Sequence, residues 1–276
     1  MSSVYSVTYV TGLDPSNLRP PPSALLVRPL ECPAMPKRHI IAIGGASFRA
    51  EPQNLAADRY ILAQTGKRHP KICFIPTASA EPVESIELFT RLYRGLGAEP
   101  SVLRFFQRTP DLRETLLTQD AIYVGGGNTK SMLAVWREWG LPDVLREAWR
   151  RGIVLGGVSA GAICWFEHGV TDSWADRLQP LACMGFLKGA CCPHYDSEVD
   201  RRPSVHAFLQ ERALPPVLAL NDGAAAHFIG RSLDHIVTWR DTGAAFMVRR
   251  VGGGVVEQKL PATRLRAYRL REEQGR

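Results

Sequence analysis

From residue 39 onward, short apolar runs alternate with longer amphipathic stretches. Apolar runs that end at glycine or proline predict strands, and apolar positions that recur every three to four residues predict helices. Strands are expected at 39–43, 71–75, 102–106, 121–124 and 153–156. Helices are expected at about 53–66, 82–96, 111–118, 128–138 and 142–151. This alternation is typical of βαβ units, so the sequence predicts an α/β fold with a mostly parallel central sheet flanked by helices.

The pattern changes after about residue 169, where the apolar runs become shorter and only one further helix, near 203–212, is indicated. The later strands are expected to extend the same domain as a mixed or antiparallel addition, at 191–194, 217–220, 225–229, 235–239 and 244–248. Residues 1–36 are rich in proline and have little periodicity, which predicts a flexible leader. Residues 37–276 are then one domain with a basic C-terminal tail, and Met35 is a hypothetical true start of translation.

Composition and charge exclude several classes of protein for this chain. A chain of 276 residues with 45% hydrophobic and 22% charged residues can bury a large core without disulfides. The formal charge of +7 lies at the two ends of the chain, as in Arg264, Arg266, Arg269 and Arg271, and no aromatic residues interleave a basic motif. No apolar run reaches the ~18 residues that cross a bilayer, and no signal-peptide pattern opens the chain. We therefore expect a cytoplasmic protein without nucleic-acid or membrane partners.

The cysteines are scattered along the chain and do not form a secreted disulfide framework. Cys191, Cys192 and His194 are close enough in sequence to raise the question of a metal site. Adjacent cysteines without a second pair of ligands make a poor zinc site, however. Free thiols are expected, with no metal ion or cofactor.

Ser159 is the candidate nucleophile. It lies in Gly157-Val158-Ser159-Ala160-Gly161, a Gly-x-Ser-x-Gly match between a predicted buried strand and an apolar helix. That context is the one a nucleophile elbow requires, because a tight turn exposes the serine and the helix presents free N–H groups to developing negative charge. The alternative is a glycine-rich packing turn in which the serine is incidental.

A second glycine cluster, Gly125-Gly126-Gly127-Asn128-Thr129, also lies between a strand and a helix. The N–H group of Gly126 or Gly127 could pair with that of Ala160 as an oxyanion hole. Asn128 and Thr129 are expected to contact the substrate, as is Asp172. A phosphate-binding loop is disfavoured because its Gly-Lys-Ser/Thr ending is absent.

A serine nucleophile needs a base and an acid that orients it. His194 is the best of seven histidines, since it ends a short apolar run and follows Pro193. The chain order of an α/β-hydrolase would instead select His227 or His235. Asp222, beside a glycine turn, is the candidate acid. Its rivals are Asp172, Asp176 and Asp196.

Four ordered motifs resemble those of peptidase family S51, which includes aspartyl dipeptidase (peptidase E) and cyanophycinase. They are Val124–Thr129, Gly157–Ala162, Pro193-His194-Tyr195 and Leu220-Asn221-Asp222-Gly223. The resemblance implies a fold like that of class I glutamine amidotransferases (flavodoxin-like), with serine replacing the cysteine nucleophile. It also implies Ser159 as nucleophile, His194 as base, and Gly127 (or Gly126) with Ala160 as oxyanion donors. Asp222 stands where the family commonly has glutamate, and Asp172 matches a second family acid.

The resemblance also bears on specificity. In aspartyl dipeptidase an arginine after the catalytic histidine holds the substrate carboxylate, and Arg201 and Arg202 lie in the corresponding segment here. Several acidic residues surround them, so the segment could attract a basic side chain, or the arginines could simply begin the next helix.

We therefore expect a serine peptidase that hydrolyses short peptides through a Ser-His-Asp triad and an acyl-enzyme, without a cofactor. The alternatives are a non-catalytic, amidotransferase-like protein that binds a small molecule, and an esterase of the α/β-hydrolase type. Exposed edge strands and Trp136, Trp139 and Trp149 favour a homodimer.

Overall fold

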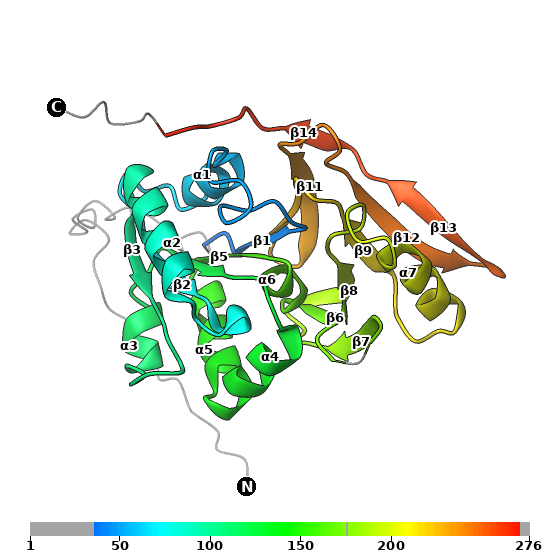
Figure 1. The fold of residues 1–276 in the computed structure, drawn as a ribbon, viewed down its shortest axis with the longest axis horizontal. Helices are drawn as coiled ribbons and strands as arrows, with labels where there is room; N and C mark the ends of the chain where they lie inside the picture. Colours follow the sequence, from blue (N-terminus) through cyan, green and yellow to red (C-terminus); the bar gives the residue numbers. More distant parts are fainter. Residues whose placement is uncertain (1–35, 175, 271–276) are drawn as a thin grey trace, which may run out of the picture. The chain divides into compact units, whose positions relative to one another are not determined.

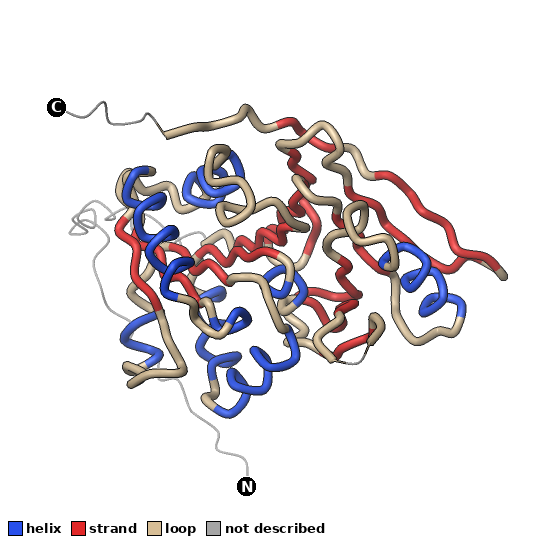
Figure 2. Tube along the Cα trace, viewed as in Figure 1, coloured by secondary structure: helices blue, strands red, loops and turns tan. Residues whose placement is uncertain are grey.

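The computed structural model describes residues 36–174 and 176–270. The leader expected at 1–36 and the proposed start at Met35 fall, apart from Pro36, outside the described residues. From Pro36 onward the chain forms one compact unit that contains two sheets (Figures 1 and 2).

The first sheet has eight strands in the order β14-β11-β10-β1-β5-β4-β2-β3. Their bounds are β1 His39–Ile43, β2 Lys71–Ile75, β3 Glu99–Val102, β4 Ala121–Val124, β5 Val154–Val158, β10 Ala224–Ile229, β11 Ser232–Thr238 and β14 Ala262–Arg264. The five strands from β1 to β3 in this order are parallel, and β10 joins β1 in antiparallel orientation. The prediction of a mostly parallel central sheet with extra C-terminal strands is confirmed.

Helices cover both faces of this sheet, with α1 and α2 on one side and α4 and α5 on the other (Figure 1). Their bounds are α1 Ala56–Ala63, α2 Val83–Gly95, α3 Leu112–Leu116, α4 Thr129–Glu138, α5 Leu141–Arg150, α6 Ala160–Ile163 and α7 Arg201–Gln210, with a 3₁₀ turn at Thr77–Ser79. In β1, Ile41 and Ile43 pack in the core beneath α1 and α2, whereas Ile40 and Ala42 belong to the core on the opposite face. Burial on both faces explains why the central strands are apolar throughout rather than alternating.

The extra C-terminal strands expected from the sequence are present, and they divide between two sheets. Only β10, β11 and β14 join the first sheet. A second sheet of six strands has the order β13-β12-β9-β8-β6-β7. Its bounds are β6 Phe166–Thr171, β7 Gln179–Ala182, β8 Leu187–Cys192, β9 Val217–Leu220, β12 Ala245–Val251 and β13 Gly254–Lys259. Short apolar runs specify a strand but not its partner, so the sequence could not assign them to two sheets.

Two elements have bounds that differ from the prediction. The third strand lies at Glu99–Val102 rather than 102–106, because β3 pairs with β2 through Glu99 and Pro100. A proline is tolerated there since β3 is an edge strand. The apolar helix expected after Ser159 ends at Ile163, and the chain enters β6 at Phe166.

The tryptophans bear on the expected homodimer. Trp136 and Trp149 are core residues at 0% and 2% exposure, and only Trp139 of the three is exposed. The two buried side chains therefore give no support to a dimer surface.

The five cysteines in the described part of the chain are free thiols, and Cys32 lies outside it. None of the helices described here is both long and apolar enough to cross a bilayer.

Candidate active site

The carboxyl ends of three central strands of the first sheet, β1, β5 and β4, lie side by side. The register pairs Ile43 of β1 with Val158 of β5, and Val124 of β4 with Gly157 of β5. Parallel strands place their carboxyl ends side by side, which is where α/β sheets bind ligands. The glycine-rich segments after β1, β4 and β5 are therefore neighbours in space.

Ser159 lies in the tight turn between β5 and α6. Its φ of 55° and ψ of −112° are strained for a residue with a side chain, and its N–H donates to the Ile43 carbonyl at 3.0 Å. The flanking glycines permit the turn, since a Cβ at Gly157 would lie 2.5 Å from the Gly161 carbonyl oxygen and one at Gly161 2.2 Å from that of Val124. The local geometry is that of the predicted strand–turn–helix elbow.

His194 and Asp222 come from the second sheet. They follow β8 and β9, which are parallel neighbours, so their ends also meet. His194 Nδ1 and Asp222 Oδ1 are 2.8 Å apart, and the side chains are 22% and 16% exposed. Asp222 is thus the acid that contacts the imidazole.

The environment of Asp222 favours its ionised form. Burial by itself would raise the pKa of this carboxyl, but hydrogen bonds from His194 and Ser197 and the charge of Arg240 outweigh burial and lower the pKa below its usual value. The Asp222 N–H also donates to Asp196 Oδ1 at 2.8 Å, which fixes the turn. An ionised Asp222 accepts a hydrogen bond from the Nδ1–H group of His194 and leaves Nε2 free to act as a base.

Ser159 and His194 line one pocket of about 380 Å³. Gly126 and Gly127 line it as well, and Ala160 begins α6 directly after the serine. A Cβ at Gly126 would lie 3.2 Å from the Ser159 Cβ, and Gly127 has a φ of +138° that excludes most other residues. The expected oxyanion donors are therefore grouped around the serine.

Asn128 and Thr129, the expected substrate contacts, do not line this pocket. The Asn128 side chain caps α4 by accepting from the Ser131 N–H and donates to the Ser173 carbonyl. Thr129 is buried at 1% exposure against Thr171. Their contacts are those of a helix cap and a packing residue.

Arg201 and Arg202 also lie away from the pocket. Arg201 is 3% exposed, and its guanidinium donates to Glu198 and to the Val170 carbonyl, each at 2.8 Å. Arg202 pairs with Glu257 and stacks on Tyr195. Their contacts are those of residues that begin α7 and tie it to the second sheet.

Asp172, the rival acid, lines a neighbouring cavity together with Asp176 and Glu198. It is among the charges that raise the pKa of Arg201 against the opposing effect of burial. His194 is bonded to Asp222 instead, so Asp172 does not occupy the orienting position.

The esterase alternative requires His227 or His235 to contact Ser159, and the structure shows no such contact. His227 bonds to His39 and Tyr60, His235 bonds to Tyr60 and Asp234, and neither lines the serine's pocket. Burial, with the charges of His39 and His235, lowers the pKa of His227 to about 4.

Five further pocket residues follow β1, namely Gly45, Ala46, Ser47, Arg49 and Ala50. The strand-end rule marks Gly44-Gly45 as a candidate ligand-binding turn. Nothing in the local sequence distinguishes Arg49 from the other arginines. Its place in the pocket is visible only in the folded chain.

Comparison with known proteins gives consistent matches. A sequence profile of peptidase family S51 matches residues 40–236. Uncharacterized peptidase YgaJ of Bacillus subtilis (strain 168) is 46% identical over 225 residues, covering 81% of this chain and 97% of the relative. Peptidase E of Streptomyces coelicolor is 27% identical over 165 residues, covering 56% and 66%. The crystal structure of a peptidase from an acI-B1 actinobacterium shares the fold, with a TM-score of 0.61 and 19% identity over 85% of this chain and 98% of that one.

Proposed function

Since the chain belongs to peptidase family S51, we propose that it is a serine-type peptidase that hydrolyses short peptides through Ser159, His194 and Asp222. One observation carries the proposal: the strained elbow serine and the histidine that Asp222 orients line the same pocket. The pocket volume, about 380 Å³, is near the lower end of the ~300–1,000 Å³ usual for small-molecule sites, which favours a short substrate.

The reaction divides into acylation and deacylation. Ser159 Oγ attacks the scissile carbonyl carbon while His194 Nε2 takes the hydroxyl proton. The N–H groups of Gly126 or Gly127 and of Ala160 stabilise the oxyanion of the tetrahedral intermediate. His194 then gives the proton to the leaving amine, and an ester remains on Ser159. Water, deprotonated by His194, attacks the ester carbonyl; the bond to Ser159 Oγ breaks, His194 returns the proton to that oxygen, and the second product leaves as a carboxylic acid.

Covalent labelling tests the proposal. A fluorophosphonate reacts only with a serine that a base activates, so we expect one adduct per chain, mapped by tryptic mass spectrometry to Ser159. In His194→Ala the adduct should disappear, whereas His69→Ala, which alters an exposed histidine on the turn before β2, should label as wild type does. An adduct on another residue, or equal labelling of His194→Ala, contradicts the assignment.

Gly45→Ala is expected to lower kcat roughly 100-fold, the scale of loss that a small misplacement of catalytic groups causes. A Cβ at Gly45 would lie 1.8 Å from Asp222 Oδ1 and 2.7 Å from His194 Nδ1, so the pair must separate. Gly253→Ala is the matched control, because a Cβ there has no atom within 4 Å. The measurement is steady-state turnover of a short peptide, and equal rates for the two variants would refute the argument.

Arg49→Ala is expected to raise KM for peptides with an acidic group or a free carboxylate by roughly tenfold, the scale of one charge-assisted hydrogen bond. Arg49 is the only cation that lines the pocket within residues 36–174 and 176–270. Amidated neutral peptides should be turned over equally by Arg49→Ala and wild type. Arg104→Ala, which removes an exposed guanidinium bonded to Gln107, serves as the control. An equal loss on acidic and neutral peptides would show that Arg49 does not read charge.

A further inference from the structure

A cluster of titratable side chains lies at the opposite end of β1 from the pocket of Ser159. His39 begins β1, whereas Gly45, two residues after its last residue, lines the pocket. At about 3.3 Å per residue, the six steps from His39 to Gly45 span up to roughly 20 Å. The cluster joins His39 to Tyr60 of α1, His227 of β10, and Asp234 and His235 of β11. The proposed peptidase chemistry uses none of them.

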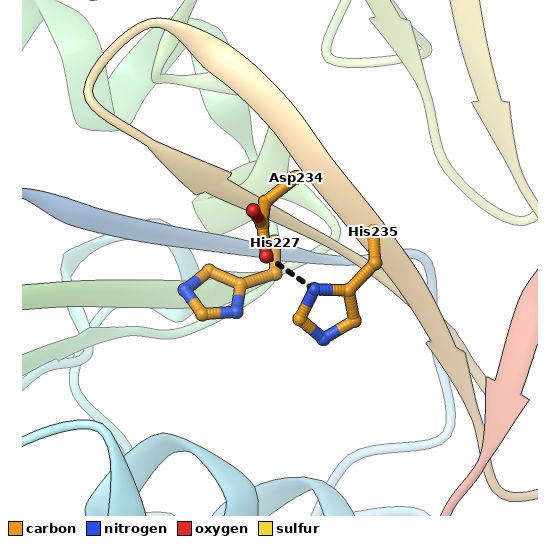
Figure 3. A group of neighbouring side chains, drawn as sticks. All are labelled: His227, Asp234 and His235. Carbon is orange, nitrogen blue, oxygen red and sulfur yellow. Dashed lines mark hydrogen bonds and ion pairs between the residues drawn. The ribbon is translucent and has the colours of Figure 1, made fainter.

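Hydrogen bonds hold the cluster together. His227 Nε2 lies 2.8 Å from His39 Nδ1, and His227 Nδ1 lies 2.6 Å from the Tyr60 hydroxyl. The same hydroxyl is 2.6 Å from His235 Nε2. His235 Nδ1 in turn lies 2.6 Å from Asp234 Oδ2 (Figure 3). A single phenolic hydroxyl is thus shared by two imidazoles, which converge on one point.

The donors are close enough to share an ion. One nitrogen each from His227 and His235 and one carboxylate oxygen from Asp234 all lie within 4.8 Å of one another. Ligands at ~2.0–2.2 Å from a tetrahedral metal ion are about 3.3–3.6 Å apart, so only a small contraction is required. The Asp234 and His235 side chains are 45% and 38% exposed and can move, while His227, at 2%, is held in place.

We propose that His227, His235 and Asp234 bind one divalent transition-metal ion of the zinc class. Two imidazoles and a carboxylate suit zinc, nickel or copper better than magnesium or calcium, which prefer oxygen ligands. Three protein ligands leave a fourth position, and the Tyr60 hydroxyl lies beside it. His39 orients His227 from its far nitrogen, as supporting groups around metal ligands commonly do.

The ion would have a structural effect at this place. Its three ligands lie on the hairpin of β10 and β11, so the ion would fix the pairing of these outer strands of the first sheet, beside Tyr60 of α1. Lys37 places a positive charge near the proposed site, where it helps to lower the pKa of both His39 and Asp234. This charge would repel a bound cation. Binding should therefore raise the Tm, and removing the Lys37 charge should tighten it roughly twofold, as expected for an exposed charge.

Zinc titration of the full chain tests the site. After chelator treatment and dialysis, calorimetry should show one saturable Zn²⁺ per chain, and the Tm should rise with added Zn²⁺. His235→Gln should weaken the affinity by at least ~100-fold and Asp234→Asn by ~10–100-fold, the range for groups that hold or support a metal ion. Both positions are exposed, so neither variant removes core packing.

His69→Gln is the matched control, since it removes an exposed histidine outside the cluster and should leave the affinity unchanged. Peptide turnover should also be equal in His235→Gln and wild type, which separates this site from that of Ser159. The proposal is overturned if no saturable binding occurs. It is equally overturned if binding survives in the Asp234→Asn/His235→Gln double variant, because the ion would then be held elsewhere, for instance by free thiols.

Discussion

Ser159→Ala is expected to reduce kcat/KM for short peptides by roughly 10,000-fold or more, the loss that follows removal of a nucleophile from a serine triad. Alanine removes only the hydroxyl, and it occupies the same strained backbone at φ 55° as serine does. The Ser159 N–H still donates to the Ile43 carbonyl, so the turn between β5 and α6 should persist. Near-native stability with lost turnover is the expected combination.

The measurement is single-turnover and steady-state hydrolysis of a peptide found by screening the wild type against a dipeptide library. Ser131→Ala is the control, since Ser131 is an exposed residue in the first turn of α4. Thermal unfolding of all three proteins should give similar Tm values. Undiminished turnover by Ser159→Ala would falsify the acyl-enzyme proposal, whereas loss of turnover with a collapsed Tm would show that the turn itself failed.

Asp222→Asn is expected to lower kcat by about 1,000- to 10,000-fold. The carboxylate accepts a hydrogen bond from the Nδ1–H group of His194 at 2.8 Å, and an amide that donates at this position would stabilise the wrong tautomer. The lowered pKa of Asp222 keeps the wild-type carboxylate ionised throughout the neutral range, so the defect should not be relieved by raising the pH from 6 to 8.

Asp172→Asn is the matched control, because Asp172 lines the adjoining cavity and was the rival acid in the sequence. Its kcat should lie close to the wild-type value. If Asp172→Asn were the more damaged of the two variants, the orienting role would pass to Asp172 and the pairing of His194 with Asp222 would be incidental to catalysis.

The placement of Ser159, His194 and Asp222 was predictable because each carries a local signal. Ser159 lies in a five-residue motif between a strand and a helix, and His194 and Asp222 each follow a short apolar strand. Parallel strands bring such ends together whatever the loops between them do. The α/β fold followed from the same alternation.

The remaining features depend on long-range contacts, which the local sequence does not encode. Arg201 and Arg202 lie in the segment after the catalytic histidine, but Arg201 is buried and donates to the carbonyl of Val170, a residue of the second sheet. Arg49 carries no motif and reaches the pocket through tertiary packing. His227 and His235 are separated in sequence from His39 and Tyr60. The antiparallel pairing of β10 with β1 and β11 brings the three histidines together, and α1 supplies Tyr60.

The site is assembled from two sheets. Ser159 and the glycine turns belong to the first, and His194 and Asp222 follow strands of the second. One hydrophobic core joins them, with Ile40 and Val124 from the first sheet and Leu218 and Leu220 from the second. A loss of register between the sheets would separate base from nucleophile while most secondary structure persists. On gentle heating, enzymatic inactivation should therefore precede the loss of far-ultraviolet circular dichroism, and refolded chains should regain activity only after the two sheets have docked.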